Sequence, residues 1–221
     1  MRALNFLAAS VLLAGAAAPA HAQTIAITGA RILTGTGSTL DNATVLVRDG
    51  RIAAVGRDVT VPAGATVIDG QGKVVTPGLI NSYTTIGIVE IEAVDETNDA
   101  ASGNDQITAA FDVRYGLNPY STLIPIERDG GVTSAVVAPG ARASIIAGMG
   151  ALIHLAGTTA DAMLDRSPVA MFGILNEGAA RRTGGARGTA VLRLRELLED
   201  VKVYAANPAA YENRDRRDLS L

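Results

Sequence analysis

The stretch Pro77-Gly78-Leu79-Ile80-Asn81-Ser82-Tyr83-Thr84-Thr85 marks a change of pattern in this chain of 221 residues. Before it, short apolar runs alternate with turns rich in glycine and aspartate. After it, the apolar runs lie further apart, and segments of helical or loop character separate them. The first pattern is typical of a small β module, and the second of units in which a helix follows a strand. We therefore predict a fold in two parts that meet at this stretch.

Residues 23–76 are predicted to form the first part, a small antiparallel β-sandwich module. The apolar runs 43–47 and 51–55 flank Asp49-Gly50, which is a strong hairpin signal because glycine accepts the positive φ of a tight turn. A second turn of the same kind is predicted at Asp69-Gly70-Gln71-Gly72, between two further apolar runs.

Residues 77–221 are predicted to form the first units of an incomplete (β/α)8 barrel, which makes the fold class α/β. A complete barrel needs about 250 residues, and the chain after Val74 has room for about three or four of the eight units. Buried strands are expected at Val132–Val137 and at 168–172, and a short hairpin within 144–155. We therefore expect a truncated product or a fragment of a longer protein.

The clearest helix is predicted over residues 189–206. Apolar residues recur there at steps of three and four, which places them on one helix face: Val191, Leu194, Leu198, Val201 and Ala205. Arg195 and Glu199 lie one turn apart and are expected to pair, at about 0.3 kcal/mol.

Residues 1–22 are predicted to be a secretory signal peptide. Arg2 precedes an apolar run over 4–18, and Ala20-His21-Ala22 fits the small residues before a cleavage site. The alternative is a membrane anchor, but the run is shorter than the about 20 residues that a span needs. We therefore expect a secreted or periplasmic protein that is cleaved after Ala22 and is not held in a membrane.

The composition excludes several kinds of site and partner. The formal net charge is −3, so no basic surface for nucleic acid is expected. The chain has no cysteine, which rules out disulfides and thiolate metal sites. Aromatic residues make up 4% of the chain, which disfavours a platform for stacking bases. The sequence leaves the oligomeric state open.

Three short motifs together carry a resemblance to a known family. They are Val75-Thr76-Pro77-Gly78-Leu79-Ile80, Gly131-Val132-Thr133 and Ala138-Pro139-Gly140. The chain resembles the N-terminal portion of the amidohydrolase superfamily, and most of all its exported, imidazolonepropionase-like branch. The resemblance implies a β-sandwich beside a (β/α)8 barrel, and hydrolysis of C–N bonds, often in cyclic amides. It also implies one or two divalent metals such as zinc, which make a bound water nucleophilic near pH 7.

The same resemblance puts the family's metal ligands at substituted positions. The His-x-His pair of the first barrel strand would fall on Tyr83 and Thr85, and the preceding aspartate on Asn81. A phenol must lose a proton near pKa 10 to bind a metal well, and threonine is a weak neutral ligand. The family's other ligands would lie in strands beyond this chain. We therefore expect no catalytic, cofactor-binding or metal-binding residue in this chain alone.

Two further groups of polar residues have a chemical and a structural interpretation. His154 lies in the apolar run 151–155, where a structural or outward-facing histidine is expected and a ligand or general base is the alternative. Acidic residues cluster after the first barrel strand, as a solvated loop or an oxygen-rich cation site: Glu90, Glu92, Asp95, Glu96 and Asp99.

Two glycine-rich segments also have two interpretations. Gly35-Thr36-Gly37-Ser38 is similar to a phosphate loop but lacks the lysine and the following helix, which favours a β-turn. The segment 184–188, with Arg181 and Arg182, precedes the best helix and could hold an anion at the helix start. A flexible loop is the preferred interpretation of that segment.

Three functional hypotheses remain open at this stage. The chain is the N-terminal part of an exported C–N hydrolase, or a non-catalytic relative that binds a small amide-like molecule, or a fragment without function. The last would expose strand edges and apolar surface. The sequence does not decide whether the chain is an enzyme.

Overall fold

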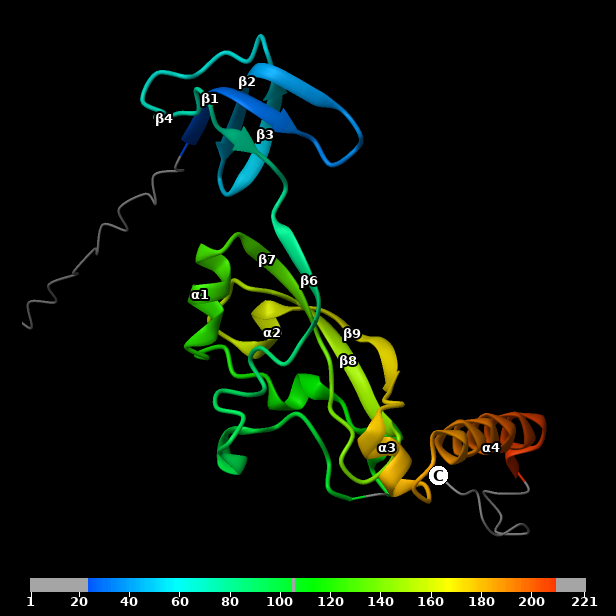
Figure 1. Cartoon of the computed structure of the whole chain (residues 1–221). Helices are drawn as coiled ribbons and strands as arrows, with labels where there is room; N and C mark the ends of the chain where they lie inside the picture. Colours follow the sequence, from blue (N-terminus) through cyan, green and yellow to red (C-terminus); the bar gives the residue numbers. More distant parts are fainter. Residues whose placement is uncertain (1–23, 105, 210–221) are drawn as a thin grey trace, which may run out of the picture. The chain divides into compact units, whose positions relative to one another are not determined.

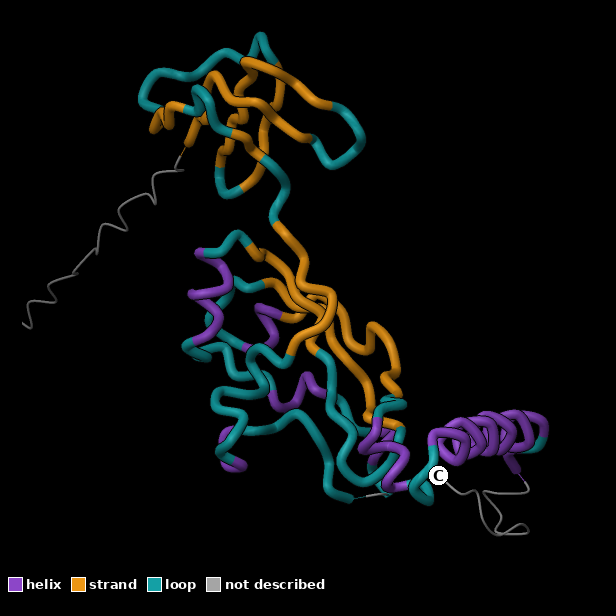
Figure 2. The backbone as a smooth tube through the Cα atoms, in the orientation of Figure 1, coloured by secondary structure: helices purple, strands orange, loops and turns teal. Residues whose placement is uncertain are grey.

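The computed structural model describes residues 24–104 and 106–209 (Figures 1 and 2). The chain divides into two compact units between Pro77 and Gly78. Each unit has its own cluster of buried apolar side chains. The predicted signal peptide at residues 1–22 lies outside the described residues.

In the first unit, five strands form one mixed sheet. β1 (Thr24–Leu33) is antiparallel to β2 (Thr39–Arg48), which is antiparallel to β3 (Arg51–Gly56). The turn between β2 and β3 is the predicted one, because Asp49 and Gly50 have φ of 53° and 71°. The first predicted hairpin is therefore confirmed.

The second predicted turn of the first unit forms, with the N–H of Lys73 donating to the carbonyl oxygen of Gly70 at 2.9 Å, but the hairpin expected around it is wrong. β4 (Thr66–Asp69) and β5 (Val74–Val75) do not pair with each other, and each runs parallel to β1. β4 pairs with residues 25–28 and β5 with residues 31–32, so the glycine-rich segment between them carries the chain along β1. The sheet is consequently mixed and not purely antiparallel. A turn motif shows where the chain bends, but not which strand its flanks will meet.

In the second unit, a four-stranded sheet has the order β6 (Leu79–Thr84), β7 (Val132–Val137), β8 (Ile146–His154) and β9 (Leu164–Gly173). β6 and β7 are parallel, and the crossover between them contains α1 (Leu123–Asp129). This is the expected strand–helix–strand unit, and the α/β class is confirmed. β8 and β9 instead pair antiparallel with their neighbours, so the expected repetition of such units does not continue past β7 in the described chain.

The hairpin predicted within residues 144–155 is replaced by the single strand β8. Gly150 lies inside this strand, where a Cβ would be 2.4 Å from the ring of Phe172 and 2.8 Å from the carbonyl oxygen of Val137. The glycine is therefore needed for close packing and not for a turn.

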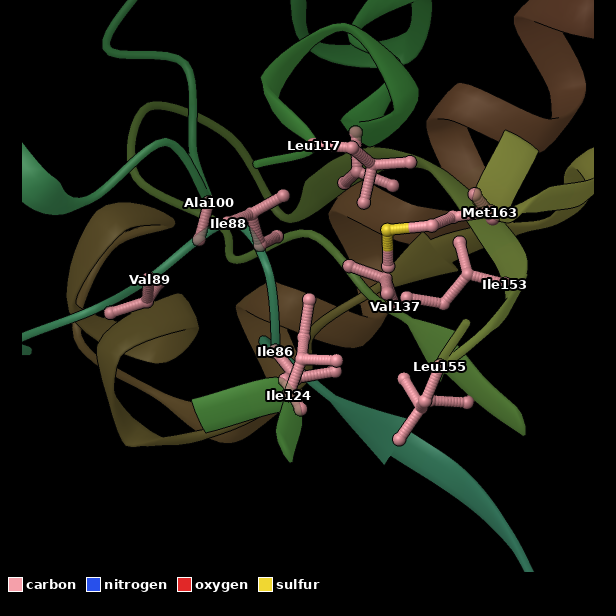
Figure 3. Close-up of a cluster of buried hydrophobic side chains, with 13 residues drawn as sticks. Ile86, Ile88, Val89, Ala100, Leu117, Ile124, Val137, Ile153, Leu155 and Met163 are labelled. Atoms are coloured by element: carbon pink, nitrogen blue, oxygen red, sulfur yellow. The ribbon is translucent and has the colours of Figure 1, made fainter. Parts of the chain in front are cut away.

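The main core of the second unit lies on one face of its sheet (Figure 3). The face is formed by alternate residues of β7 and β8, namely Ala135, Val137, Ala151 and Ile153. Apolar residues from the turn after β6, from α1, from α2 (Ala160–Met163) and from the short 3-10 turn Val113–Gly116 cover this face: Ile86, Ile88, Val89, Val113, Ile124 and Met163. This arrangement fixes the loops that follow β6.

The predicted C-terminal helix is confirmed as α4 (Arg187–Ala206), which follows α3 (Glu177–Arg182). The packed face of α4 differs from the expected one. Ala190 and Leu197 are buried against Ile145 and Ala179, whereas Leu198 is 55% exposed. In the described part of the chain, no helix combines the length and apolar character needed to cross a membrane.

The ion pair expected on α4 also has a different partner. Glu199 accepts from Lys202 at 3.1 Å, three residues further along, and the predicted partner Arg195 makes no ion pair with a residue that the structure describes. Pairs at three and four residues are both close on a helix surface, so local sequence does not choose between them.

Candidate functional site

The Pro-Gly-Leu-Ile motif begins the parallel pair of strands in the second unit. A Cβ on Gly78 would lie 2.2 Å from the side chain of Thr133, so glycine is required where the chain approaches β7. The backbone N–H of Leu79 then donates to the carbonyl oxygen of Gly131 at 2.9 Å. The motif thus places β6 beside β7 and determines where its last residues lie.

Tyr83 takes part in an aromatic contact between β6 and β9. Its ring centroid is 6.1 Å from that of Phe172, and the two planes are inclined by 56°. Its backbone N–H donates to Oδ1 of Asn81 at 3.2 Å. The structure therefore uses both Asn81 and Tyr83 in local contacts, and the Tyr83 side chain is 58% exposed.

Thr85 lies where β6 ends in a buried turn. Its carbonyl oxygen accepts from the backbone N–H groups of Ile88 and Val89, both at 3.0 Å. Ile86 and Ile88, which follow Thr85 in the sequence, belong to the main core (Figure 3). The segment after β6 is thus held by backbone hydrogen bonds and apolar packing.

These residues do not fit a zinc centre of the family type. Asn81, Tyr83 and Thr85 offer an amide, a phenol and a hydroxyl, whereas zinc sites are built from imidazole, thiolate and carboxylate. Among residues 24–104 and 106–209, no three His, Cys, Asp or Glu side chains are grouped so that they could hold a metal ion.

His154 is placed with two other polar residues on adjacent strands. Its Nδ1 is 3.1 Å from Oγ of Ser134 on β7, and its Nε2 is 3.5 Å from Oδ1 of Asp165 on β9. The imidazole is 55% exposed. Ser134 lies inside the sheet, with paired strands on both sides, so its backbone surroundings supply no oxyanion site of the kind that acyl transfer requires. The three residues form a polar contact on the sheet surface.

The acidic residues after β6 do not converge. Glu90 accepts from the backbone N–H of Thr122 at 3.3 Å, just before α1. Asp95 pairs with Arg142 at 3.1 Å, while Glu92 and Glu96 are exposed. The cluster in the sequence is therefore spread over a loop, with each member in separate surroundings.

The two glycine-rich segments are connections. Residues 35–38 form the turn between β1 and β2, closed by the N–H of Thr34 and the carbonyl oxygen of Ser38 at 3.1 Å. A strand follows this turn, whereas a phosphate loop opens a helix. At the other segment, the N–H of Gly185 donates to the carbonyl oxygen of Ala180 at 2.7 Å and ends α3. Arg181 is already paired with Glu177 at 2.6 Å.

Sequence reasoning missed a buried charged group at Asp112. This side chain is 7% exposed and accepts from the hydroxyl of Ser167, with distances of 2.9 and 3.0 Å to its two oxygens. Its Oδ1 also accepts the backbone N–H of Arg114 at 3.0 Å, and its Oδ2 is 3.2 Å from Nε of Arg114. An aspartate two residues before an arginine is a weak local signal, and Ser167 is 55 residues away.

Arg114 lines a cavity of about 340 Å³ beside the main core. The other lining residues are Tyr115, Leu117, Ala160, Asp161 and Leu164. Asn81, Tyr83 and Thr85 are not among them.

The fold resembles a solved amidohydrolase from Thermotoga maritima MSB8. The TM-score is 0.71 at 23% identity, over 89% of this chain and 52% of that chain. No family model matches the sequence. Among curated proteins, the chain is similar to the amidohydrolase tasK of Hapsidospora irregularis. The two are 29% identical over 104 residues, and the match covers 46% of this chain. The chain is also 51% identical over 45 residues, 20% of this chain, to an imidazolonepropionase of Klebsiella pneumoniae.

Parts of this chain are thus similar in sequence to proteins of the amidohydrolase superfamily, and its fold is similar to that of a solved amidohydrolase. The matched parts make up 11% of the length of either curated amidohydrolase relative. Proteins of this superfamily generally use divalent metals, and Asn81, Tyr83 and Thr85 do not offer the imidazole, thiolate or carboxylate donors of a zinc site.

Proposed function

We propose that this chain is an amidohydrolase scaffold of the exported, imidazolonepropionase-like branch that is catalytically incomplete by itself. The observation that carries the proposal is that Tyr83 and Thr85 follow the Pro-Gly-Leu-Ile motif at the spacing expected of the His-x-His metal ligands. Tyr83 is engaged with Phe172, and Thr85 ends the strand in a buried turn. Hydrolysis of a C–N bond needs an activated water, and these side chains do not hold the metal that would activate it.

The proposal is tested by metal content and by hydrolysis. The purified chain is dialysed against zinc, freed of excess metal and analysed by plasma mass spectrometry. We expect well under one zinc per chain, and no turnover of dihydroorotate, hydantoin or dipeptides. Stoichiometric zinc together with hydrolysis of any of these compounds would overturn the proposal.

A pair of histidine variants shows whether only the first-strand ligands are lacking. Tyr83→His with Thr85→His restores the His-x-His spacing, and Thr39→His with Asp41→His makes the same spacing on the exposed face of β2. We expect equal, weak zinc binding by the two double variants, because further ligands are absent from the described chain. Markedly tighter binding at residues 83 and 85 would show that other ligands are present and would contradict the proposal.

The second candidate function is binding of a small molecule without catalysis. The cavity beside Arg114 favours it, since it brings one cationic, one anionic and several apolar side chains together. Calorimetry with small ligands tests this candidate independently of metal content.

A further inference from the structure

The guanidinium of Arg114 is held in place by a buried network. Asp112 accepts the backbone N–H of Arg114 at 3.0 Å and begins the 3-10 turn Val113–Gly116, so the arginine side chain returns beside the carboxylate. Nε of Arg114 then lies 3.2 Å from Oδ2 of Asp112. The hydroxyl of Ser167 on β9 binds both oxygens of the same carboxylate and holds it in position. The anchor of the arginine is thus built from two distant segments.

An aromatic contact adjoins the other end of the arginine, at a tyrosine that is 79% exposed. The guanidinium carbon lies 4.5 Å from the ring centroid of Tyr115, and Nη2 donates to the hydroxyl of that tyrosine. A guanidinium held against a carboxylate and a ring loses little freedom on binding a ligand. It is also the group best suited to bind a carboxylate through two parallel hydrogen bonds.

The cavity that Arg114 lines contains a second charge of opposite sign. Asp161, in the first turn of α2, lines the same cavity and is exposed. It makes no ion pair with any residue that the structure describes. Leu117, Ala160 and Leu164 supply the apolar part of the wall. The cavity therefore combines a cation, an anion and an apolar surface.

This combination favours one class of ligand. Asp112 already balances the charge of Arg114, so a simple anion such as phosphate would meet one arginine and two carboxylates. A ligand that brings an ammonium group to Asp161 and a carboxylate to the remaining N–H groups of Arg114 adds no net charge, and each of its own charges faces a side chain of opposite sign. The volume of about 340 Å³ is at the lower end of ligand pockets, which run from about 300 to 1,000 Å³.

We propose that this cavity binds a small zwitterion with an apolar side chain, of the size of a free apolar amino acid. The carboxylate lies against Arg114, the ammonium against Asp161 and the side chain against Leu117 and Leu164. The proposal goes beyond the assignment of an incomplete hydrolase. It does not involve Asn81, Tyr83 or Thr85. A zinc result that contradicts the incomplete hydrolase therefore leaves the zwitterion site untouched, and a negative ligand-binding result leaves the incomplete hydrolase untouched.

Calorimetry of the full chain with three matched ligands tests the charge pattern. L-leucine carries both charges, leucinamide lacks the carboxylate, and 4-methylpentanoate lacks the ammonium. We expect leucine to bind, and each analogue to bind about tenfold more weakly, because each loses one charge-assisted hydrogen-bonded contact. No heat with leucine, or equal affinity for the three compounds, would overturn the proposal.

Matched variants locate the site. Asp161 is exposed, and Asp161→Asn is a conservative change. We expect this variant to bind leucine about tenfold more weakly and to keep its affinity for 4-methylpentanoate. Asp129→Asn, an exposed aspartate at the end of α1, is the control and should leave both affinities unchanged. Arg114→Lys should weaken leucine and 4-methylpentanoate alike but spare leucinamide, with a thermal melt to verify its fold. Equal leucine affinity in the Asp161→Asn and Asp129→Asn variants would contradict the assignment.

Discussion

The ring of Tyr83 on β6 lies 6.1 Å from the ring of Phe172 on β9, measured between centroids. β6 and β9 are the two ends of the strand order, and strands in a sheet are about 4.8 Å apart. In a flat sheet these two strands would be about 14 Å apart. The two side chains therefore lean toward each other across the sheet. Tyr83, which we propose stands at a metal-ligand position of the family, is used here for packing between strands.

A double-mutant cycle measures this contact. We expect Tyr83→Ala and Phe172→Ala each to lower the free energy of unfolding by about 1 kcal/mol, because the tyrosine is more than half exposed. The coupling between them should be about 0.5 kcal/mol, the lower end for aromatic pairs. Tyr120→Ala, at a ring that is 78% exposed, is the control and should cost less. Additive losses in the double variant would show that the rings do not interact.

Gly150 makes room for this aromatic pair. A Cβ there would lie 2.4 Å from the Phe172 ring and 2.8 Å from the carbonyl oxygen of Val137. The ring can turn away but the backbone oxygen cannot, so we expect Gly150→Ala to cost about 1–3 kcal/mol in urea unfolding.

Gly188 is the matched control for that substitution. It lies in α4, and a Cβ there meets nothing within 4 Å. Gly188→Ala should therefore stabilise the protein slightly, by up to about 0.5 kcal/mol, because alanine is the better helix former and the position lies in the first turn of α4. A neutral Gly150→Ala beside a stabilising Gly188→Ala would contradict the packing argument.

Local features of this fold were predictable from the sequence. The Asp49-Gly50 turn adopts the positive φ that its residues suggest, and α4 begins within two residues of the predicted start. The start of β6 also follows its motif, since Gly78 is the residue type that can approach Thr133 closely. In each case the physical cause lies in a few adjacent residues or in one close approach.

Contacts between distant segments were not predictable in the same way. β4 and β5 pair with β1 and not with each other, and nothing in their own residues selects that partner. The carboxylate of Asp112 accepts hydrogen bonds from Ser167, which lies 55 residues further along the chain on β9. The cavity beside Arg114 depends on that network, so its charge pattern became visible only in the folded chain.

The Asp112 network is expected to be a main source of stability in the second unit. Asp112→Asn keeps the shape but turns an amide donor toward Ser167 or Arg114 and leaves the guanidinium without its counter-charge. We expect a loss of about 2–3 kcal/mol, against about 1 kcal/mol for Ser167→Ala, which removes one hydrogen bond. Asp129→Asn serves as the control, with a change below about 0.5 kcal/mol. If Asp112→Asn and Asp129→Asn lowered the free energy of unfolding by the same amount, the contacts of Asp112 with Ser167 and Arg114 would not stabilise the fold.

The two adjacent leucines of α4 test which face of the helix is packed. Leu197 is 5% exposed and contacts the cluster around Ile145, whereas Leu198 is 55% exposed. Both fit an apolar spacing of three or four, so the spacing alone does not separate them. We expect Leu197→Ala to cost about 2–3 kcal/mol in urea unfolding and Leu198→Ala less than about 0.5 kcal/mol, because only the first opens a cavity.

The same pair shows whether α4 has a further contact in solution. Both substitutions remove the same atoms and the same helix propensity, so the difference between them reports packing alone. If Leu198→Ala cost as much as Leu197→Ala, the exposed face of α4 would have to be covered by something that the described chain does not supply. Sedimentation of the wild-type chain over a range of concentrations would then distinguish a second copy of the chain from a contact within it.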